Sequence, residues 1–166
     1  MTTTPATTLP VRRTRSGVPL TVAGLGGAQF GNLFREIDEA DVDRIIDAAW
    51  AAGIRYFDTA PHYGMGLSER RLGRALQRYP RDEFVLSTKV GRIIRDNPGG
   101  TGWDEQFYRV PRTTKRVLDY TADGVRTSIE ESLDRLGLDR IDLVYIHDPD
   151  EYWDDAINGA VPALQE

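Results

Sequence analysis

Four side chains that could exchange protons lie at or just after short apolar runs of the sequence: Asp58, Tyr63, Lys89 and His147. Two of these residue types are scarce, because the 166-residue chain has two lysines and two histidines. A tyrosine hydroxyl holds its proton up to about pH 10, and a neighbouring ammonium group stabilises the tyrosinate. A carboxylate keeps that ammonium charged and oriented, and a histidine offers a second donor. Together these groups could deliver or remove a proton at a carbonyl or alcohol oxygen.

Each of these residues also has an ordinary structural interpretation. A lysine at a strand end is commonly solvated, an aspartate there can cap a turn, and a tyrosine or histidine can simply pack or bond to backbone. The functional interpretation is favoured because Asp58, Lys89 and His147 each follow an apolar run directly, and Tyr63 lies on the loop after the first run. The carboxyl ends of parallel strands share one rim, and that rim holds the site in α/β sheets.

The elements that would position these residues alternate between extended and helical patterns. A β-hairpin is expected from residues 11–13 and 18–22. Strands are predicted at residues 22–26, 54–57, 83–88 and 141–146. Helices are predicted from the capping residues Asp38 and Ser68 and from about Thr121, with apolar residues at helical spacing behind each. Residues 150–166 would begin a fourth helix, which Gly159 and Pro162 weaken.

This order predicts an α/β fold with a parallel sheet covered by helices. Strands laid down in sequence with right-handed crossovers give a (β/α)₈ TIM barrel, of which the chain holds the first four βα units after the hairpin. A doubly wound open sheet is the alternative. Residues 91–120 interrupt the alternation with a Gly-, Pro- and Arg-rich segment, which is expected to be a functional loop.

Composition excludes several classes of protein. The chain has no cysteine, which rules out disulfides, thiolate zinc sites and a cysteine nucleophile. The net charge of −5 and the absence of a basic block argue against nucleic-acid binding. No apolar run is long enough for a membrane span. Residues 1–10 are Thr-rich and are expected to be a disordered lead-in, with a cytoplasmic location; arginines at 12, 13 and 15 leave a transit peptide as the alternative.

The sequence contains partial patterns for two other kinds of site, a dinucleotide fingerprint and a metal site. Residues 24–29 begin like a dinucleotide fingerprint, but Gln29 replaces the third glycine and no acidic residue follows at the required distance. The side chains that could be imagined as metal ligands are His62, His147, Asp148 and Asp150. Their spacing matches no metal-binding pattern, and no metal is expected.

Three segments resemble signatures of the aldo/keto reductase superfamily. Residues 55–64 read Arg-Tyr-Phe-Asp-Thr-Ala-Pro-His-Tyr-Gly and are followed by Leu67-Ser68-Glu69 and Leu72-Gly73. Residues 86–90 and 144–150 resemble the family's lysine and histidine motifs on the third and fourth strands. Residues 31–34, the stretch from His62 to Arg71 and the 91–120 segment are most similar to the sugar-dehydrogenase branch. That branch contains D-threo-aldose (L-fucose) 1-dehydrogenases and relatives of pyridoxal 4-dehydrogenase.

The resemblance implies an NADP- or NAD-dependent oxidoreductase that interconverts a carbonyl or sugar hemiacetal with an alcohol or lactone, without a metal. Asp58, Tyr63, Lys89 and His147 fall on the four positions of the family's catalytic tetrad. Tyr63 would exchange the proton, Lys89 would stabilise its tyrosinate, Asp58 would position Lys89, and His147 would orient the substrate oxygen. Gly27, Ala28 and Asp58 would border the nicotinamide ribose. The substrate would be a small aldehyde, ketone or sugar.

The resemblance covers residues 11–166, which would form the N-terminal half of a barrel, since a full barrel needs about 250 residues. In the family, most dinucleotide contacts come from strands 5–8. The chain is therefore expected to be either a truncated piece of a longer enzyme or a natural half-barrel. The alternative function is an inactive half-barrel that folds or acts only with a partner. The isolated chain is expected to self-associate through its unpaired edge strands.

Overall fold

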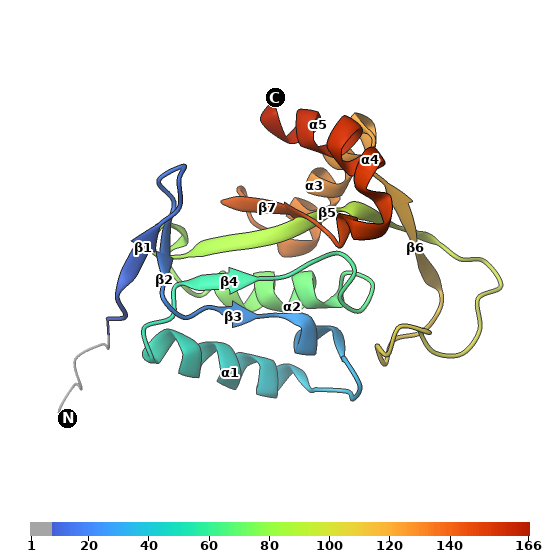
Figure 1. Cartoon of the computed structure of the whole chain (residues 1–166). Helices are drawn as coiled ribbons and strands as arrows, with labels where there is room; N and C mark the ends of the chain where they lie inside the picture. The colour runs from blue at the N-terminus through green and yellow to red at the C-terminus, as the bar shows by residue number, and fades with distance from the viewer. Residues whose placement is uncertain (1–7) are drawn as a thin grey trace.

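The computed structural model describes residues 8–166 (Figure 1). The strands are β1 (Val11–Arg13), β2 (Pro19–Thr21), β3 (Leu25–Gly26), β4 (Tyr56–Asp58), β5 (Val85–Asp96), β6 (Thr114–Asp119) and β7 (Leu143–Ile146). The main helices are α1 (Glu39–Ala51), α2 (Leu67–Leu76) and α3 (Ala122–Leu136). Short helical turns η1 (Ala28–Gly31) and η2 (Arg81–Glu83) precede α1 and β5. The expected lead-in at residues 1–10 falls mainly on residues 1–7, which lie outside the described residues.

The strands β3, β4, β5 and β7 form a parallel sheet in that order, with β5 between β4 and β7. Each strand therefore lies beside its predecessor among the parallel strands, and the order does not reverse. A sequential order is that of a barrel and not of a doubly wound sheet. The predicted hairpin is also present, since β1 pairs antiparallel with β2 and Val11 lies opposite Thr21. Figure 1 shows this hairpin at the amino end of the sheet.

The helices form where the sequence places caps and apolar faces. Asp38 accepts a hydrogen bond from the Asp41 amide at the start of α1, and Thr121 accepts one from the Gly124 amide at the start of α3. The main core lies between α1, α2 and the sheet, and its fully buried residues include Ile46, Phe57, Leu72, Leu76 and Leu86. A second core packs α3 against β5 and the C-terminal segment. These two cores fix the strands whose ends carry the site.

Two local predictions were wrong. Ser68 does not cap α2: Gly66, with φ +77, precedes the helix, and Ser68 is buried inside its first turn. The Ser68 hydroxyl donates instead to the Gly27 carbonyl (2.7 Å) and lies 2.8 Å from the Thr59 hydroxyl. The strands predicted to begin at residues 22, 54 and 141 begin two or three residues later, at residues 25, 56 and 143, where pairing with the neighbouring strand starts.

The segment at residues 91–120 is not one long loop. Strand β5 continues past Lys89 to Asp96 and pairs antiparallel with β6, so that Gly91 lies opposite Asp119. Gly91 has φ +98, and a Cβ there would lie 2.4 Å from the Tyr120 ring, so glycine allows the strand to turn beside that ring. Within the segment, residues 97–113 and the final residue, Tyr120, lie outside these two strands. Figure 1 shows the resulting hairpin extending away from the body of the sheet.

The C-terminal segment is helical but broken, as Gly159 and Pro162 suggested. It consists of η3 (Pro149–Tyr152), α4 (Trp153–Asp155), the π-helical turn η4 (Ala156–Ala160) and α5 (Val161–Gln165). Gly159 lies against the backbone of Tyr120, where a Cβ would come within 2.3 Å of the carbonyl oxygen. This close approach allows the C-terminal segment to pack against the start of α3.

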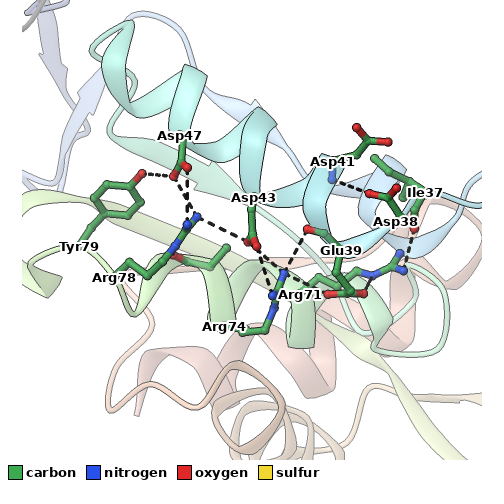
Figure 2. A network of polar contacts seen from close by, with 11 residues as sticks. Ile37, Asp38, Glu39, Asp41, Asp43, Asp47, Arg71, Arg74, Arg78 and Tyr79 are labelled. Carbon is green, nitrogen blue, oxygen red and sulfur yellow. Dashed lines mark hydrogen bonds and ion pairs between the residues drawn. The ribbon is translucent and has the colours of Figure 1, made fainter.

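Charged side chains at four-residue spacing tie α1 to α2 (Figure 2). Arg74 pairs with Asp43 at 3.0 Å, and Arg78 pairs with Asp47 at 2.9 Å. These pairs are largely exposed, so each contributes about 0.2–1 kcal/mol. Arg71 differs, because its side chain is 10 % exposed and also donates to the carbonyls of Phe30 and Ile37. Arg71 therefore anchors the chain between η1 and α1 to α2.

Candidate active site

Lys89 and Asp58 form the centre of the candidate site. The Lys89 ammonium donates to Asp58 Oδ2 at 2.6 Å and to the Thr59 carbonyl at 3.0 Å. The two side chains are 15 % and 26 % exposed. Asp58 ends β4 as predicted, whereas Lys89 lies within β5 because that strand continues into the hairpin. The amine is thus held by two acceptors beside the end of β4, and one of its three donors is left for a further group.

Tyr63 lies next to this amine. The Lys89 Nζ atom is 4.8 Å from the centre of the Tyr63 ring. The turn that carries Tyr63 is fixed by a close backbone approach, since a Cβ on Gly31 would lie 2.5 Å from the Tyr63 carbonyl carbon. Gly64, with φ +64, meets Gly31 from the other side. Two glycines are therefore needed where this turn crosses η1, and the crossing holds Tyr63 over Lys89.

His147 completes the cluster from the end of β7. Its ring centre lies 5.7 Å from that of Tyr63 and 5.0 Å from that of His62. Its backbone amide donates to the Val90 carbonyl at 3.0 Å, which continues the pairing of β7 with β5. The residue is 6 % exposed, and its Nδ1 atom has no hydrogen-bond partner among the described residues. The structure therefore brings all four sequence-predicted residues together at one edge of the sheet.

Both histidines of the site are held neutral. Burial, reinforced by Arg92, lowers the pKa of His147 to about 4. Burial, with Arg116 and His147 nearby, lowers the pKa of His62 to about 3. Arg92 Nη1 lies 3.0 Å from His62 Nδ1, and since a guanidinium can only donate, that ring nitrogen must accept. The proton of neutral His62 is therefore on Nε2.

These lowered pKa values predict an acid-sensitive fold. The unfolded chain takes up protons on both histidines as the pH falls below about 6.5, whereas the folded chain does so only near pH 3–4. Stability is therefore complete above pH 6.5 and is lost as the pH falls toward 4. In His62→Asn the amide oxygen can still accept a hydrogen bond from Arg92, but the side chain no longer titrates. We therefore expect the loss of unfolding free energy between pH 7 and pH 4.5 to be smaller in the variant by about 2 kcal/mol, with solvent screening taken into account. Urea unfolding of the protein at its natural length, at both pH values, measures this change. Equal losses of unfolding free energy in parent and variant would contradict it.

Several residues of the site were missed by sequence reasoning. Arg116 and Asp104 form a buried pair at 2.6 Å, with side chains 9 % and 4 % exposed. Arg116 also donates to the His62 carbonyl at 2.8 and 3.1 Å, so β6 holds the turn that carries Tyr63. Tyr108 is 4 % exposed and packs against His62 and Tyr63. The two adjacent isoleucines at 93 and 94 are a weak signal that the strand continues, and no spacing signals the pairing of residues 104 and 116.

The residues expected to border a nicotinamide ribose lie beside this cluster. The Gly27 amide donates to the Asp58 carbonyl at 2.7 Å, and Ala28 begins η1. A Cβ on Gly27 would lie 2.8 Å from Ser68 Oγ, so this glycine has a packing role of its own. Ala28 is half-buried, the Asp58 carboxylate is partly exposed, and the Nδ1 atom of His147 is buried without a partner among the described residues. The donors and acceptors present fit the nicotinamide end of a dinucleotide.

Residues 8–166 contain no group of three or more His, Asp or Glu side chains arranged to hold a metal ion. Among the same residues, every helix falls short of the length and apolar character that a membrane span requires.

Comparison with known proteins gives consistent matches. Residues 23–166 match the model of the aldo/keto reductase family. The chain is 51 % identical over 156 residues to D-threo-aldose 1-dehydrogenase of a Pseudomonas species, covering 91 % of this chain and 47 % of that relative. It is 40 % identical over 147 residues to pyridoxal 4-dehydrogenase of Microbacterium luteolum, covering 81 % of this chain and 41 % of the relative. The chain thus spans about half the length of the curated relatives it matches.

Solved structures give the same result. An aldo-keto reductase from Pseudomonas aeruginosa superimposes with a TM-score of 0.72 at 32 % identity, covering 96 % of this chain and 55 % of that one. The glycerol dehydrogenase of Gluconobacter oxydans superimposes with a TM-score of 0.69 at 31 % identity, covering 98 % and 45 %. These matches confirm the predicted barrel fold, of which the described sheet supplies the first four parallel strands.

Proposed function

The chain belongs to the aldo/keto reductase family, and we propose that it carries the proton-transfer site of an NAD(P)-dependent oxidoreductase. The reaction interconverts a carbonyl or sugar hemiacetal with an alcohol or lactone. The observation that carries this proposal is the Lys89 ammonium, bonded to Asp58 at 2.6 Å and 4.8 Å from the Tyr63 ring centre, with His147 beside that ring. A tyrosine next to a fixed ammonium is suited to proton exchange with a substrate oxygen.

The proposed mechanism assigns one task to each residue. Tyr63 gives its proton to the carbonyl oxygen in reduction and takes the hydroxyl proton in oxidation. Lys89 stabilises the tyrosinate between these events, and Asp58 holds Lys89 in place. His147, neutral near pH 7, donates a hydrogen bond that orients the substrate oxygen. The nicotinamide, when bound, supplies or accepts the hydride at the adjacent carbon. Gly27, Ala28 and Asp58 would border its ribose.

The substrate class we propose is an aldose, oxidised at its anomeric carbon. The support is the name of the relative that is 51 % identical, D-threo-aldose 1-dehydrogenase, together with that of a 32 % identical relative, L-galactose dehydrogenase of Arabidopsis thaliana. The cofactor is NADP or NAD, and the protein is proposed to act in the cytoplasm. Neither nucleic acid nor a membrane has a role in this proposal.

The test is a nicotinamide absorbance assay on the protein purified at its natural length. A panel of aldoses that differ at single hydroxyl groups is tested with oxidised NAD and with oxidised NADP. Simple aldehydes are tested with the reduced form of each cofactor. We expect reduced nicotinamide to form with one or more aldoses. The proposal would be contradicted if no combination of substrate and cofactor changed the absorbance. Activity that appears only after a second polypeptide is added would instead support the inactive half-barrel that needs a partner.

The 166-residue chain by itself is expected to self-associate. Strand β7 pairs with β5 alone among the described strands, and its Tyr145 side chain is 43 % exposed. An unpaired, uncharged strand edge is a template for association. Sedimentation of this polypeptide should show dimers or larger species, with little cooperative thermal unfolding and no saturable NADPH quenching. A cooperative monomer that binds NADPH would contradict this expectation.

A further inference from the structure

A row of hydroxyl groups leads away from Asp58 across the face of the sheet opposite the helices. Ser87 Oγ lies 2.6 Å from Asp58 Oδ1, and the Tyr56 hydroxyl lies 3.1 Å from Ser87 Oγ. The Tyr145 hydroxyl lies 3.2 Å from that of Tyr56. The row thus begins at one oxygen of the carboxylate whose other oxygen binds Lys89.

Strand register explains why these side chains share one face. Ser87 lies opposite Asp58 in the β4–β5 pair, and Tyr145 lies opposite Lys89 in the β5–β7 pair. Tyr56 is two residues before Asp58, and alternate residues of a strand point to the same side. Thr88 points to the other side, where it donates to Glu69 of α2 at 2.7 Å. The row therefore lies on the face that carries the proton-transfer site.

The direction of each hydrogen bond follows from the strongest acceptor. Ser87 Oγ lies 2.6 Å from Asp58 Oδ1 and 3.4 Å from the Phe57 carbonyl, and a carboxylate only accepts, so Ser87 donates mainly to Asp58. Ser87 can then only accept from Tyr56, and Tyr56 in turn can only accept from Tyr145. Burial raises the pKa of Tyr56 to about 12, so this hydroxyl keeps its proton at neutral pH. The row is thus a directed series of donors, Tyr145 to Tyr56 to Ser87, which ends on the Asp58 carboxylate.

Fixing Asp58 matters because its side chain is 26 % exposed and could otherwise rotate. Lys89 holds one carboxylate oxygen and Ser87 holds the other, so the carboxylate has one orientation. Ser87 is fully buried and cannot be replaced in this role by water without repacking. Hydrogen bonds to a charged group are the stronger ones, and donors in series polarise one another.

We infer that Ser87, supported by Tyr56 and Tyr145, is a positioning residue that sets the direction in which Asp58 holds Lys89 beside Tyr63. Ser87 acts through Asp58 and touches neither substrate nor cofactor. The inference rests on the proposed function, because positioning has a catalytic meaning only if Tyr63 exchanges the proton. Without the Ser87 donor, Lys89 is held less firmly beside Tyr63, and the tyrosinate is stabilised less.

The experiment follows the ionisation of Tyr63 by ultraviolet difference spectroscopy against Tyr63→Phe, with the protein at its natural length. This readout needs no turnover. The variants are Ser87→Ala, Tyr56→Phe and Tyr145→Phe, and the last two remove one hydroxyl each without changing the shape of the ring. Ser128→Ala is the matched control, since Ser128 is 1 % exposed and its hydroxyl has no partner among the described residues.

We expect Ser87→Ala to move the midpoint of Tyr63 ionisation to higher pH by about one unit, which is a tenfold change in the ionisation equilibrium. This effect is smaller than the full contribution of a hydrogen bond to a charged group, because Ser87 acts on Tyr63 only through Asp58 and Lys89. Tyr56→Phe should move it less, Tyr145→Phe least, and Ser128→Ala not at all. If Ser87→Ala fails to fold, Tyr56→Phe carries the test.

Two results would overturn the inference. One is an unchanged midpoint in both Ser87→Ala and Tyr56→Phe. The other is an equal shift in Ser128→Ala, which would indicate a general loss of packing. The same titration separates this inference from the proposed function. A graded shift in a protein that oxidises no aldose leaves the positioning role intact and overturns only the function. An unchanged midpoint in a protein that does oxidise an aldose overturns the positioning role and leaves the proposed function intact.

Discussion

Replacing Tyr63 by phenylalanine is expected to lower turnover by about 10²–10⁴-fold, the usual contribution of a positioned proton-transfer group. The phenyl ring of the variant would keep the contacts with His147 and Tyr108, whose ring centres lie 5.7 and 6.3 Å from that of Tyr63. Only the hydroxyl is removed, so cofactor binding and thermal stability should stay close to those of the parent. Steady-state kinetics with the preferred aldose, together with a cofactor titration, measure both effects.

Tyr79→Phe provides the matched control for this variant. Tyr79 likewise carries one hydroxyl on its ring, but that hydroxyl donates to Asp47 on the outer surface of α1, away from the site (Figure 2). Its replacement should leave turnover unchanged. Turnover of Tyr63→Phe within a few-fold of the parent, with an unaltered fold, would mean that another group carries the proton.

The second large effect is expected from the buried carboxylate of Glu69. This side chain is fully buried, accepts from Arg135 Nε at 2.5 Å and accepts from Thr88 Oγ1 at 2.7 Å. It thereby joins α2, α3 and β5 at the residue before Lys89. Glu69→Gln removes the negative charge and leaves the Arg135 guanidinium, which is 14 % exposed, short of a partner. Breaking a buried ion pair in this way costs about 3–5 kcal/mol of unfolding free energy.

Urea unfolding of Glu69→Gln, made in the protein at its natural length, measures this cost, and Asp47→Asn is the control. Asp47 is 51 % exposed in its pair with Arg78, and such surface pairs contribute about 0.2–1 kcal/mol. A loss below about 1 kcal/mol in Glu69→Gln would show that Glu131, 3.5 Å from Arg135, and the Ser132 hydroxyl compensate for the missing charge.

The sequence predicted the residues whose position depends on strand ends. Asp58 is the last residue of β4 and His147 follows β7 directly, and the rule that parallel strands share one rim is enough to bring them together. Lys89 was placed at a strand end for the same reason, although β5 continues for seven residues beyond it, from 90 to 96. The glycine and arginines after Lys89 resemble a loop in composition, and residues 90–96 have no period-two pattern from which the pairing of β5 with β6 could be predicted.

The features that were missed depend on contacts between distant residues. A serine within an apolar strand has no pattern that marks it, so Ser87 is recognised only once β4 lies beside it and Asp58 faces it. The pairing of Asp104 with Arg116 arises because residues 97–113 fold back onto β6, and irregular backbone has no period from which this could be read. Ser68 was assigned as a cap because its residue type is typical of one, but the chain already begins the helix after Gly66.

The most direct test of the central claim, that Tyr63, Lys89, Asp58 and His147 together serve hydride transfer at an aldose carbon, uses a substrate deuterated at that carbon. The protein is incubated with this aldose and the oxidised nicotinamide cofactor, and the cofactor is then analysed by mass spectrometry. We predict that the reduced cofactor carries one deuterium atom after incubation with the parent protein, and that almost no deuterium is transferred by Tyr63→Phe over the same time. No deuterium in the cofactor with any aldose, or equal transfer by parent and variant, would contradict the account.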